Sequence, residues 1–205
     1  MAAIDEHAHN LSEYASSIRL KSIPGIFAED IRAATQGPAL VSYCEKALGD
    51  RIVCDLDECW VRRQYAPRNY PPRHAPHSWH QDGALRFDFS HHLSEDQPNG
   101  VLDMVTCWIA LTPCGVDAPG LELIATSPDV LIAPANLTDE RVRRRFAPEE
   151  FVRPQMQSGD ALLFSGEVLH RTHVSSSMSK DRTSIELRFF SANRISERLK
   201  GDHFT

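Results

Sequence analysis

The chain has 205 residues, of which 41% are hydrophobic and 24% charged, and its formal net charge is -6. A chain of this length can bury a substantial core without staples. The mild acidity argues against nucleic-acid binding, which would require a clear basic excess. The five cysteines are odd in number and form no CxxC pair, so we expect free thiols, no disulfide framework and a cytoplasmic location.

The beginning of the chain shows neither a signal peptide nor a membrane anchor. No basic segment is followed by an apolar one, and no apolar stretch approaches the ~20 residues that a membrane span needs. Helical signals dominate the first 50 residues instead: apolar residues recur at helical spacing over 11–20, and a second helix is predicted over 27–35. Proline at 38 and glycine at 49 suit the two ends of a third helix. We therefore expect a soluble protein with a helical start.

After residue 50 the pattern changes to short β-rich segments whose connections contain Pro, Gly, Asn and Asp. We predict strands at 51–65, 77–89, 101–111, 121–125, 151–154, 161–164, 168–173 and 183–190. This order predicts a mainly β (α+β) sandwich or jelly roll with the N-terminal helices packed on one sheet. We expect one domain over 1–205, with a β core over about 51–190 and a short C-terminal tail.

The last predicted strand separates polar from apolar side chains. Four polar residues share one of its faces: Arg182, Ser184, Glu186 and Arg188. The residues between them are apolar from position 185 onward. Such a polar face lies either in solvent or in a polar cavity inside a roll, and the pattern alone favours solvent.

His80 and Asp82 form a His-x-Asp pair that could bind a metal. On a strand, side chains two residues apart point the same way, with Cα atoms ~6.5–7 Å apart. A second histidine from another strand would complete the two histidines and one carboxylate of the non-haem Fe(II) oxygenases. The predicted strand over 161–164 leads to His170, which could supply it. The alternative is that His80 is an ordinary core or surface histidine.

Two further readings concern the neighbours of these residues. Arg182 with Ser184 could bind a carboxylate, since a guanidinium pairs with it bidentately. A zinc cluster is conceivable because five histidines lie close in sequence: His74, His77, His80, His91 and His92. The prolines at 71, 72 and 76 oppose a helix there, so the three-residue spacing does not converge on one face. His74 and His77 are better interpreted as loop residues near the mouth of a site.

The order and wording of several segments resemble the phytanoyl-CoA dioxygenase-like family of Fe(II)/2-oxoglutarate oxygenases. The matching segments are WHQDG at 79–83, TCWIALTPC at 106–114, APGLELI at 118–124, GDALLFSGEVLHRTH at 159–173 and RTSIELRFF at 182–190. They span about residues 50–190, and their combination is specific although each alone is not. The resemblance implies a double-stranded β-helix, cupin-like in form, in which the polar face of the last strand lines a cavity.

The resemblance also implies roles for individual residues. His80, Asp82 and His170 would bind iron as the catalytic centre. The co-substrate 2-oxoglutarate would contact a set of polar residues and a tryptophan: Arg182 at its distal carboxylate, Thr172 or Ser184, Trp108 and, more weakly, Gln64. His173 remains a rival to His170, because the interval to the arginine is one residue longer than the family pattern.

Substrate contacts are expected from Arg86, Phe87, Glu186 and Arg188, and more weakly from Glu122. Glu186 and Arg188 have the alternative of a structural ion pair, since buried unpaired charges are costly.

The implied activity is a dioxygenase that hydroxylates, or otherwise oxidises, a C–H bond of a small polar metabolite or natural-product intermediate. It would consume dioxygen and release succinate and CO2. A carboxylate at Asp82 favours hydroxylation, because related halogenases have a small residue there. The alternative is a cupin-like metal-dependent isomerase or a non-catalytic metal-binding module, which would have no need of Arg182, Ser184 or Trp108. We expect no nucleic-acid or membrane partner, and neither the substrate nor the oligomeric state follows from the sequence.

Overall fold

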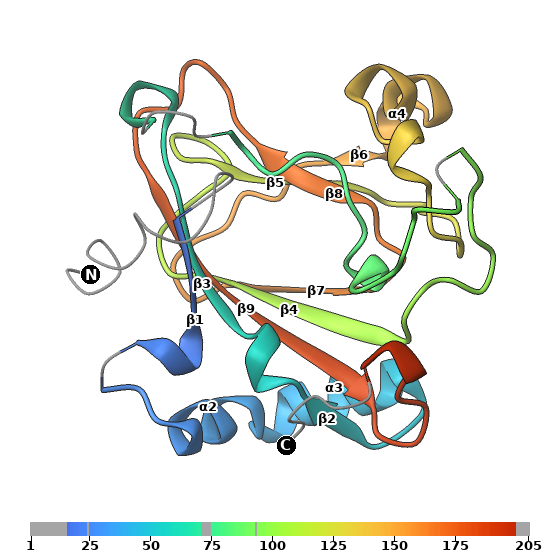
Figure 1. The fold of residues 1–205 in the computed structure, drawn as a ribbon. Helices are drawn as coiled ribbons and strands as arrows, with labels where there is room; N and C mark the ends of the chain where they lie inside the picture. Colours follow the sequence, from blue (N-terminus) through green and yellow to red (C-terminus); the bar gives the residue numbers. More distant parts are fainter. Residues whose placement is uncertain (1–15, 24, 71–74, 93, 200–205) are drawn as a thin grey trace.

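A computed structural model describes residues 16–23, 25–70, 75–92 and 94–199 (Figure 1). The helices are α2 (Ala28–Thr35), α3 (Pro38–Leu48) and α4 (Asp139–Arg145). The strands are β1 (Ser16–Arg19), β2 (Ile52–Cys54), β3 (Trp60–Gln64), β4 (Met104–Ala110), β5 (Gly120–Ile124), β6 (Phe151–Val152), β7 (Ala161–Ser165), β8 (His170–His173) and β9 (Arg182–Ser191).

The strands form two facing antiparallel sheets. The large sheet has the order β1-β3-β9-β4-β7, with β2 also paired to β9, and the small sheet has the order β6-β5-β8. Figure 1 shows the small sheet above the large one, with α2 and α3 on the far side of the large sheet. The fold is therefore the mainly β double-stranded β-helix, or jelly roll, that the sequence predicts.

The large sheet separates an apolar face from a polar one. On the helix side, Leu187 and Phe189 of β9 pack in one buried cluster with Ile31 of α2 and with Cys44 and Leu48 of α3. Each such side chain contributes about 1.5–3 kcal/mol when fully buried. The predicted packing of the N-terminal helices on one sheet is confirmed, and the opposite face of β9 is left to the space between the sheets.

The second and third predicted helices are confirmed as α2 and α3. Pro38 occupies the first turn of α3, and Gly49 ends it in the left-handed region at φ +63°. The helix predicted over 11–20 is wrong where it can be compared. Residues 16–19 form β1, which pairs with β3 and buries Ile18. Pairing to a sheet edge overrides a short helical pattern, and residues 11–15 lie outside the described part of the chain.

Two predicted strands need correction. The segment 51–65 is β2 and β3 separated by a 3-10 helix over Leu56–Glu58, which Asp55 caps by accepting from the Asp57 N–H at 2.8 Å. The segment 77–89 forms no strand in the part that the structure describes. It makes one isolated bridge, between His80 and His170, and then turns into a 3-10 helix over Asp82–Ala84. The other six predicted strands correspond to β4 through β9.

All five cysteines are buried free thiols, as expected. Within the described residues, no helix combines the length and the apolar character needed to cross a membrane.

Candidate active site

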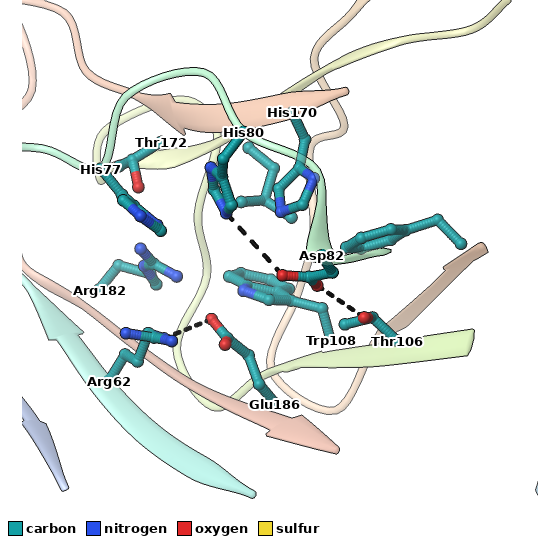
Figure 2. Close-up of a pocket in the computed structure, with 12 residues that line it drawn as sticks. Arg62, His77, His80, Asp82, Thr106, Trp108, His170, Thr172, Arg182 and Glu186 are labelled. Atoms are coloured by element: carbon teal, nitrogen blue, oxygen red, sulfur yellow. Dashed lines mark hydrogen bonds and ion pairs between the residues drawn. The ribbon is translucent and has the colours of Figure 1, made fainter. Parts of the chain in front are cut away.

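A cavity of about 130 Å³ lies between the two sheets (Figure 2). Its lining comes from β3, β4, β5, β7, β8, β9 and the loop before β4: Arg62, His77, His80, Asp82, Thr106, Trp108, Leu121, Phe164, His170, Thr172, Arg182 and Glu186. Because side chains alternate along a strand, the lining residues of any one strand are two or more positions apart and point to the same side. The polar face of β9 thus lies in a cavity and not in solvent.

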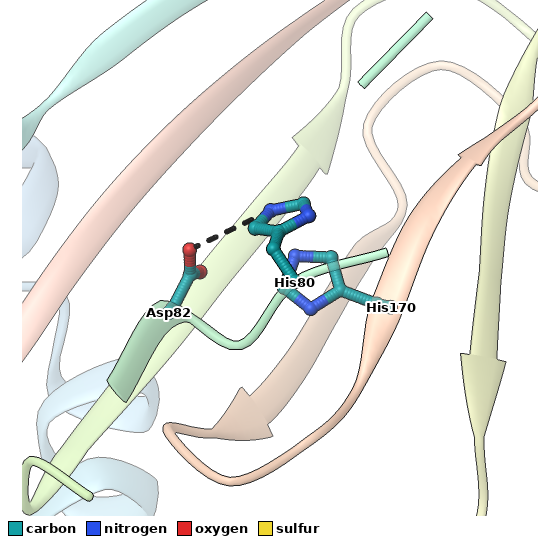
Figure 3. A group of neighbouring side chains, drawn as sticks. All are labelled: His80, Asp82 and His170. Carbon is teal, nitrogen blue, oxygen red and sulfur yellow. Dashed lines mark ion pairs between the residues drawn. The ribbon is translucent and has the colours of Figure 1, made fainter. Parts of the chain in front are cut away.

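His80, Asp82 and His170 converge at one end of this cavity (Figure 3). One ligand atom of each lies within 4.8 Å of the others, and His80 Nε2 is 4.0 Å from Asp82 Oδ1. Two backbone hydrogen bonds join the segments, from His80 N to His170 O at 2.9 Å and from His170 N to His80 O at 3.0 Å. The convergence that the sequence predicts is present, although Asp82 reaches it from a 3-10 turn and not from a strand.

Both histidines use ring nitrogen Nδ1 for a contact with the backbone, which leaves Nε2 available to a metal. His80 Nδ1 lies 2.7 Å from the Ser78 carbonyl oxygen, and His170 Nδ1 lies 2.9 Å from that of Val168. A carbonyl can only accept, so each Nδ1 carries a hydrogen, and in the neutral imidazole Nε2 is then the nitrogen with the free lone pair. Desolvation, reinforced by the neighbouring His170 and His77 rings, lowers the pKa of His80. The neutral imidazole is the form that binds a metal.

Asp82 is held as a carboxylate. Its Oδ1 accepts from Arg188 Nη2 at 2.8 Å, and its Oδ2 accepts from Thr106 Oγ1 at 2.6 Å. Burial alone would raise the pKa of Asp82, but the Arg188 guanidinium, helped by the Thr106 hydrogen bond, outweighs it and holds that pKa well below its usual range. Two neutral imidazoles and one ionised carboxylate are a donor set that suits a divalent first-row metal.

Arg182 also lines the cavity and has no carboxylate partner among the residues that the structure describes. Its side chain is buried, Nη1 donates to Ser184 Oγ at 2.8 Å, and the guanidinium lies 4.9 Å from the Trp108 ring centre. Among the described residues, no acidic group forms an ion pair with it, and neither Arg182 Nε nor Trp108 Nε1 has a hydrogen-bond acceptor. Burial lowers the pKa of Arg182 to about 10. Burying a guanidinium with one unused N–H, next to an indole with another, costs free energy. An anionic ligand would supply the missing charge and acceptors.

The remaining co-substrate candidates lie around Arg182. Thr172 lines the cavity, Ser184 bonds Arg182, and Gln64 is fully buried as the residue opposite Arg182 in the β3–β9 register. His173 lies on the other face of β8, where burial and the nearby Arg153 guanidinium lower its pKa. The structure therefore brings His170 and not His173 to the metal group.

The alternative zinc cluster is not formed by the described histidines. His77 lies in a loop and lines the cavity, with its pKa lowered by burial to about 4. Within the described residues, the one group of metal-ligating side chains is His80, Asp82 and His170, which leaves out His91 and His92. His74 lies outside the described part of the chain.

Of the predicted substrate contacts, only Glu186 lines the cavity, where its Oε1 accepts from Arg62 Nε at 2.7 Å. Arg188 lies 3.9 Å from Glu186, but its closer contacts are Asp82 and Glu58. Both charges are therefore held in ion pairs, as the structural alternative predicts, but each makes its shortest ion pairs with other residues.

The other three substrate candidates lie away from the lining. Arg86 has φ +55° and places Nη2 3.9 Å from Glu58 Oε1, and Phe87 packs against Phe89 with 4.7 Å between ring centres. Glu122 is fully buried on the outer face of the small sheet, where Arg171 and Arg153 each approach it to 2.6 Å.

Sequence reasoning missed several residues that form the site. Arg62 and Thr106 stand two positions from Gln64 and Trp108, so strand alternation could have placed them in the cavity. Glu58 carried no signal, because the segment around it was predicted as continuous strand.

The fold and the site define a class: a double-stranded β-helix with two histidines and an aspartate beside a buried, carboxylate-free arginine. The family model of phytanoyl-CoA dioxygenase (PhyH) matches residues 6–184. The chain belongs to this family.

Solved structures of similar fold include EctD, SnoN and SnoK. EctD from S. alaskensis with bound Fe has a TM-score of 0.59 at 15% identity, over 80% of this chain and 53% of EctD. The epimerase SnoN from nogalamycin biosynthesis has a TM-score of 0.56 at 16% identity, over 86% of this chain and 61% of SnoN. The carbocyclase SnoK from the same biosynthesis has a TM-score of 0.60 at 16% identity, over 93% of this chain and 73% of SnoK.

These identities show a shared fold, and the chain spans little more than half the length of EctD. Comparison with curated proteins gives no match.

Proposed function

We propose that the chain is a single-domain Fe(II)/2-oxoglutarate-dependent dioxygenase that oxidises a C–H bond of a small molecule, consuming dioxygen and releasing succinate and CO2. The observation that carries the proposal is the metal-ligating group of His80, Asp82 and His170 beside Arg182, a buried cation without a carboxylate. Membership of the PhyH family supports it. So do the related structures of EctD with Fe and of EctD with 2-oxoglutarate and 5-hydroxyectoine.

In this proposal each residue acts through a group already described. His80 and His170 would hold Fe(II) through Nε2, and Asp82 would hold it through its carboxylate. Arg182 would pair with the distal carboxylate of 2-oxoglutarate, because the guanidinium offers donors that no described acidic residue uses. Iron and 2-oxoglutarate, when bound together, would allow dioxygen to act as the oxidant of a C–H bond, with 2-oxoglutarate supplying two of the electrons.

The surroundings of Arg182 complete the proposed co-substrate site. Trp108 would offer its unused indole N–H and a flat apolar surface, and Ser184 and Thr172 would add hydroxyl groups. Phe164 and Leu121 supply apolar lining, which limits the water around the reacting groups.

The substrate class and the type of oxidation are finer parts of the proposal. We favour a small polar substrate, because Arg62, Glu186 and His77 bring polar groups to the cavity. We favour hydroxylation, because Asp82 provides a third protein ligand where a halide would otherwise need room. SnoN is an epimerase and SnoK a carbocyclase on the same fold, so product analysis decides this part. A cytoplasmic location stays a prediction from the cysteine content.

The test is a visible spectrum of the purified protein with Fe(II) and 2-oxoglutarate in the absence of oxygen. We expect a weak charge-transfer band that needs both additions and that is lost in His170→Ala and Asp82→Ala. His173→Ala is the matched control, because this histidine lies on the opposite face of β8 and its removal should leave the band intact. Confirmed iron binding without any band would contradict the proposal and favour the metal-dependent isomerase or binding module.

A further inference from the structure

The carboxylate of Asp82 has a donor on each oxygen before any metal is present. Arg188 Nη2 donates to Oδ1 at 2.8 Å, and Thr106 Oγ1 donates to Oδ2 at 2.6 Å. Both donors are buried, with Arg188 only 7% exposed and Thr106 1% exposed. The terminal torsion of an aspartate is broad and roughly two-fold, so nothing in the side chain itself would fix the plane of this carboxylate. The two donors fix it.

The two donors are neighbours in the large sheet. Thr106 of β4 and Arg188 of β9 lie directly opposite each other in the antiparallel register, and both side chains project to the cavity face. Asp82 therefore rests on a pair of residues held at a constant spacing by the sheet. Each oxygen accepts one hydrogen bond and keeps a lone pair, and Oδ1 lies 4.0 Å from His80 Nε2.

Arg188 is in turn held and neutralised by Glu58. Its Nη1 donates to Glu58 Oε2 at 2.9 Å, and that oxygen also accepts from Trp60 Nε1 at 3.3 Å. Glu58 reaches this position because the 3-10 helix over Leu56–Glu58 separates β2 from β3, which both pair with β9. The pair of Arg188 and Glu58 has no net charge, so Arg188 can hold Asp82 with less repulsion of a divalent cation than a lone arginine would cause.

We propose that Arg188, held by Glu58, is a positioning residue that fixes the Asp82 carboxylate toward His80 and His170 and thereby sets the affinity of the site for a divalent metal. The inference rests on the proposed function, because it takes these three residues as the ligands. A purely structural ion pair would stabilise the fold equally well whether or not its partner was a ligand. Here the partner is the one acidic member of the metal group, and both of its oxygens are engaged.

The test measures binding of Co(II), without 2-oxoglutarate or turnover, by calorimetry and by the visible d–d spectrum. The main variant is the double substitution Glu58→Gln with Arg188→Met, which removes one negative and one positive charge and so leaves the net charge unchanged. Loss of a partner that orients a ligand typically lowers metal affinity about 10–100-fold, and we expect a loss in this range with an altered d–d spectrum. Arg188→Lys keeps a charged donor and should recover part of the affinity.

The matched control is Arg63→Met with Asp181→Asn. This pair joins at 2.9 Å, and Arg63 lies on β3 with its side chain on the face opposite Arg62. Co(II) affinity and spectrum should stay at wild-type values, although the substitution also removes a half-buried ion pair.

The outcomes are distinguishable. A folded double variant with wild-type Co(II) affinity and spectrum would overturn the inference while leaving the proposed function intact. Failure of the wild-type protein to bind Co(II) or Fe(II) would overturn the proposed function and the inference with it. If the double variant does not fold, Glu58→Gln alone takes its place, because it removes the charge that holds Arg188. Wild-type Co(II) affinity and spectrum in that variant would overturn the inference.

Discussion

Arg182 and Arg188 lie on the same face of the same strand, six positions apart, and their surroundings are opposite. Arg188 makes ion pairs at 2.8 and 2.9 Å with Asp82 and Glu58, whereas Arg182 has a serine hydroxyl and the face of Trp108. Burial acts on both, yet the pKa of Arg188 is raised by its acidic neighbours while that of Arg182 is lowered to about 10.

The difference separates an arginine whose charge the protein compensates itself from one whose charge is left for a ligand to compensate. A buried arginine with two carboxylates is satisfied internally and can hold another side chain in place. A buried arginine with none carries an uncompensated desolvation cost that only an incoming anion removes. One alternating strand thus supplies both a positioning group and a binding group.

The largest expected effect is on stability. Arg188→Met leaves Asp82 and Glu58 buried without their shared cation, and breaking a buried pair from one side costs about 3–5 kcal/mol. Urea unfolding of the metal-free protein should show a loss of this size. A variant as stable as wild type would mean that Arg188 is not the internal partner that its distances indicate.

Arg182→Met should have the opposite pattern. Removing a buried cation without an acidic partner should leave the free energy of unfolding of the ligand-free protein unchanged or higher. The affinity for 2-oxoglutarate should fall by about 2–5 kcal/mol, the usual cost of truncating one partner of a buried charge pair. Titration of the Co(II)-loaded protein with 2-oxoglutarate measures it, and retained affinity would show that the distal carboxylate binds elsewhere.

Trp108→Phe sharpens the contrast at the Arg182 end. It keeps an aromatic surface but removes the buried indole N–H that has no acceptor among the described residues. If that N–H donates to the bound co-substrate, its loss should weaken 2-oxoglutarate binding by about 1 kcal/mol, or roughly five-fold. The smaller ring also leaves space in the buried core and should lower the stability of the ligand-free protein somewhat, so affinity is the deciding readout. Unchanged 2-oxoglutarate affinity would contradict the assignment.

The smallest effect is a pH dependence at a third cluster, where one buried carboxylate, Glu122, meets Arg171 and Arg153 outside the cavity. Burial opposes ionisation there, but these arginines lower the pKa of Glu122 below the usual value of 4.5 for a glutamate. A depressed folded pKa gives stability that is present above the unfolded pKa and is lost as pH falls through the folded one. Glu122→Gln should therefore flatten the decline of unfolding free energy below about pH 4.5, relative to wild type.

Much of the fold could be predicted because local signals and packing agree. Pro38 and Gly49 mark the ends of α3, and alternation along β9 separates a helix-facing surface from a polar one. β1 could not be predicted, since its strand conformation depends on pairing with β3, which lies more than 40 residues away in sequence.

The site was predictable where one strand carries the residues and less so where a turn does. His170, Thr172 and the polar row of β9 follow from alternation, once the polar face is assigned to a cavity by family resemblance. Asp82 and Glu58 reach the site from 3-10 turns within segments that look like continuous strands. The spacing to His80 reveals Asp82 as a candidate ligand but not the turn that carries it. Glu58 depends on tertiary contacts alone, and no pattern along the chain reveals it.

The backbone bridge between His80 and His170 has a consequence for dynamics. Exchange of either amide hydrogen with solvent requires the two segments to part, and this opening also separates the two imidazoles. An ion that binds only the closed form adds its binding free energy to the cost of opening. Hydrogen exchange of these two amides therefore reports metal binding, and it should become slower as the metal binds more tightly.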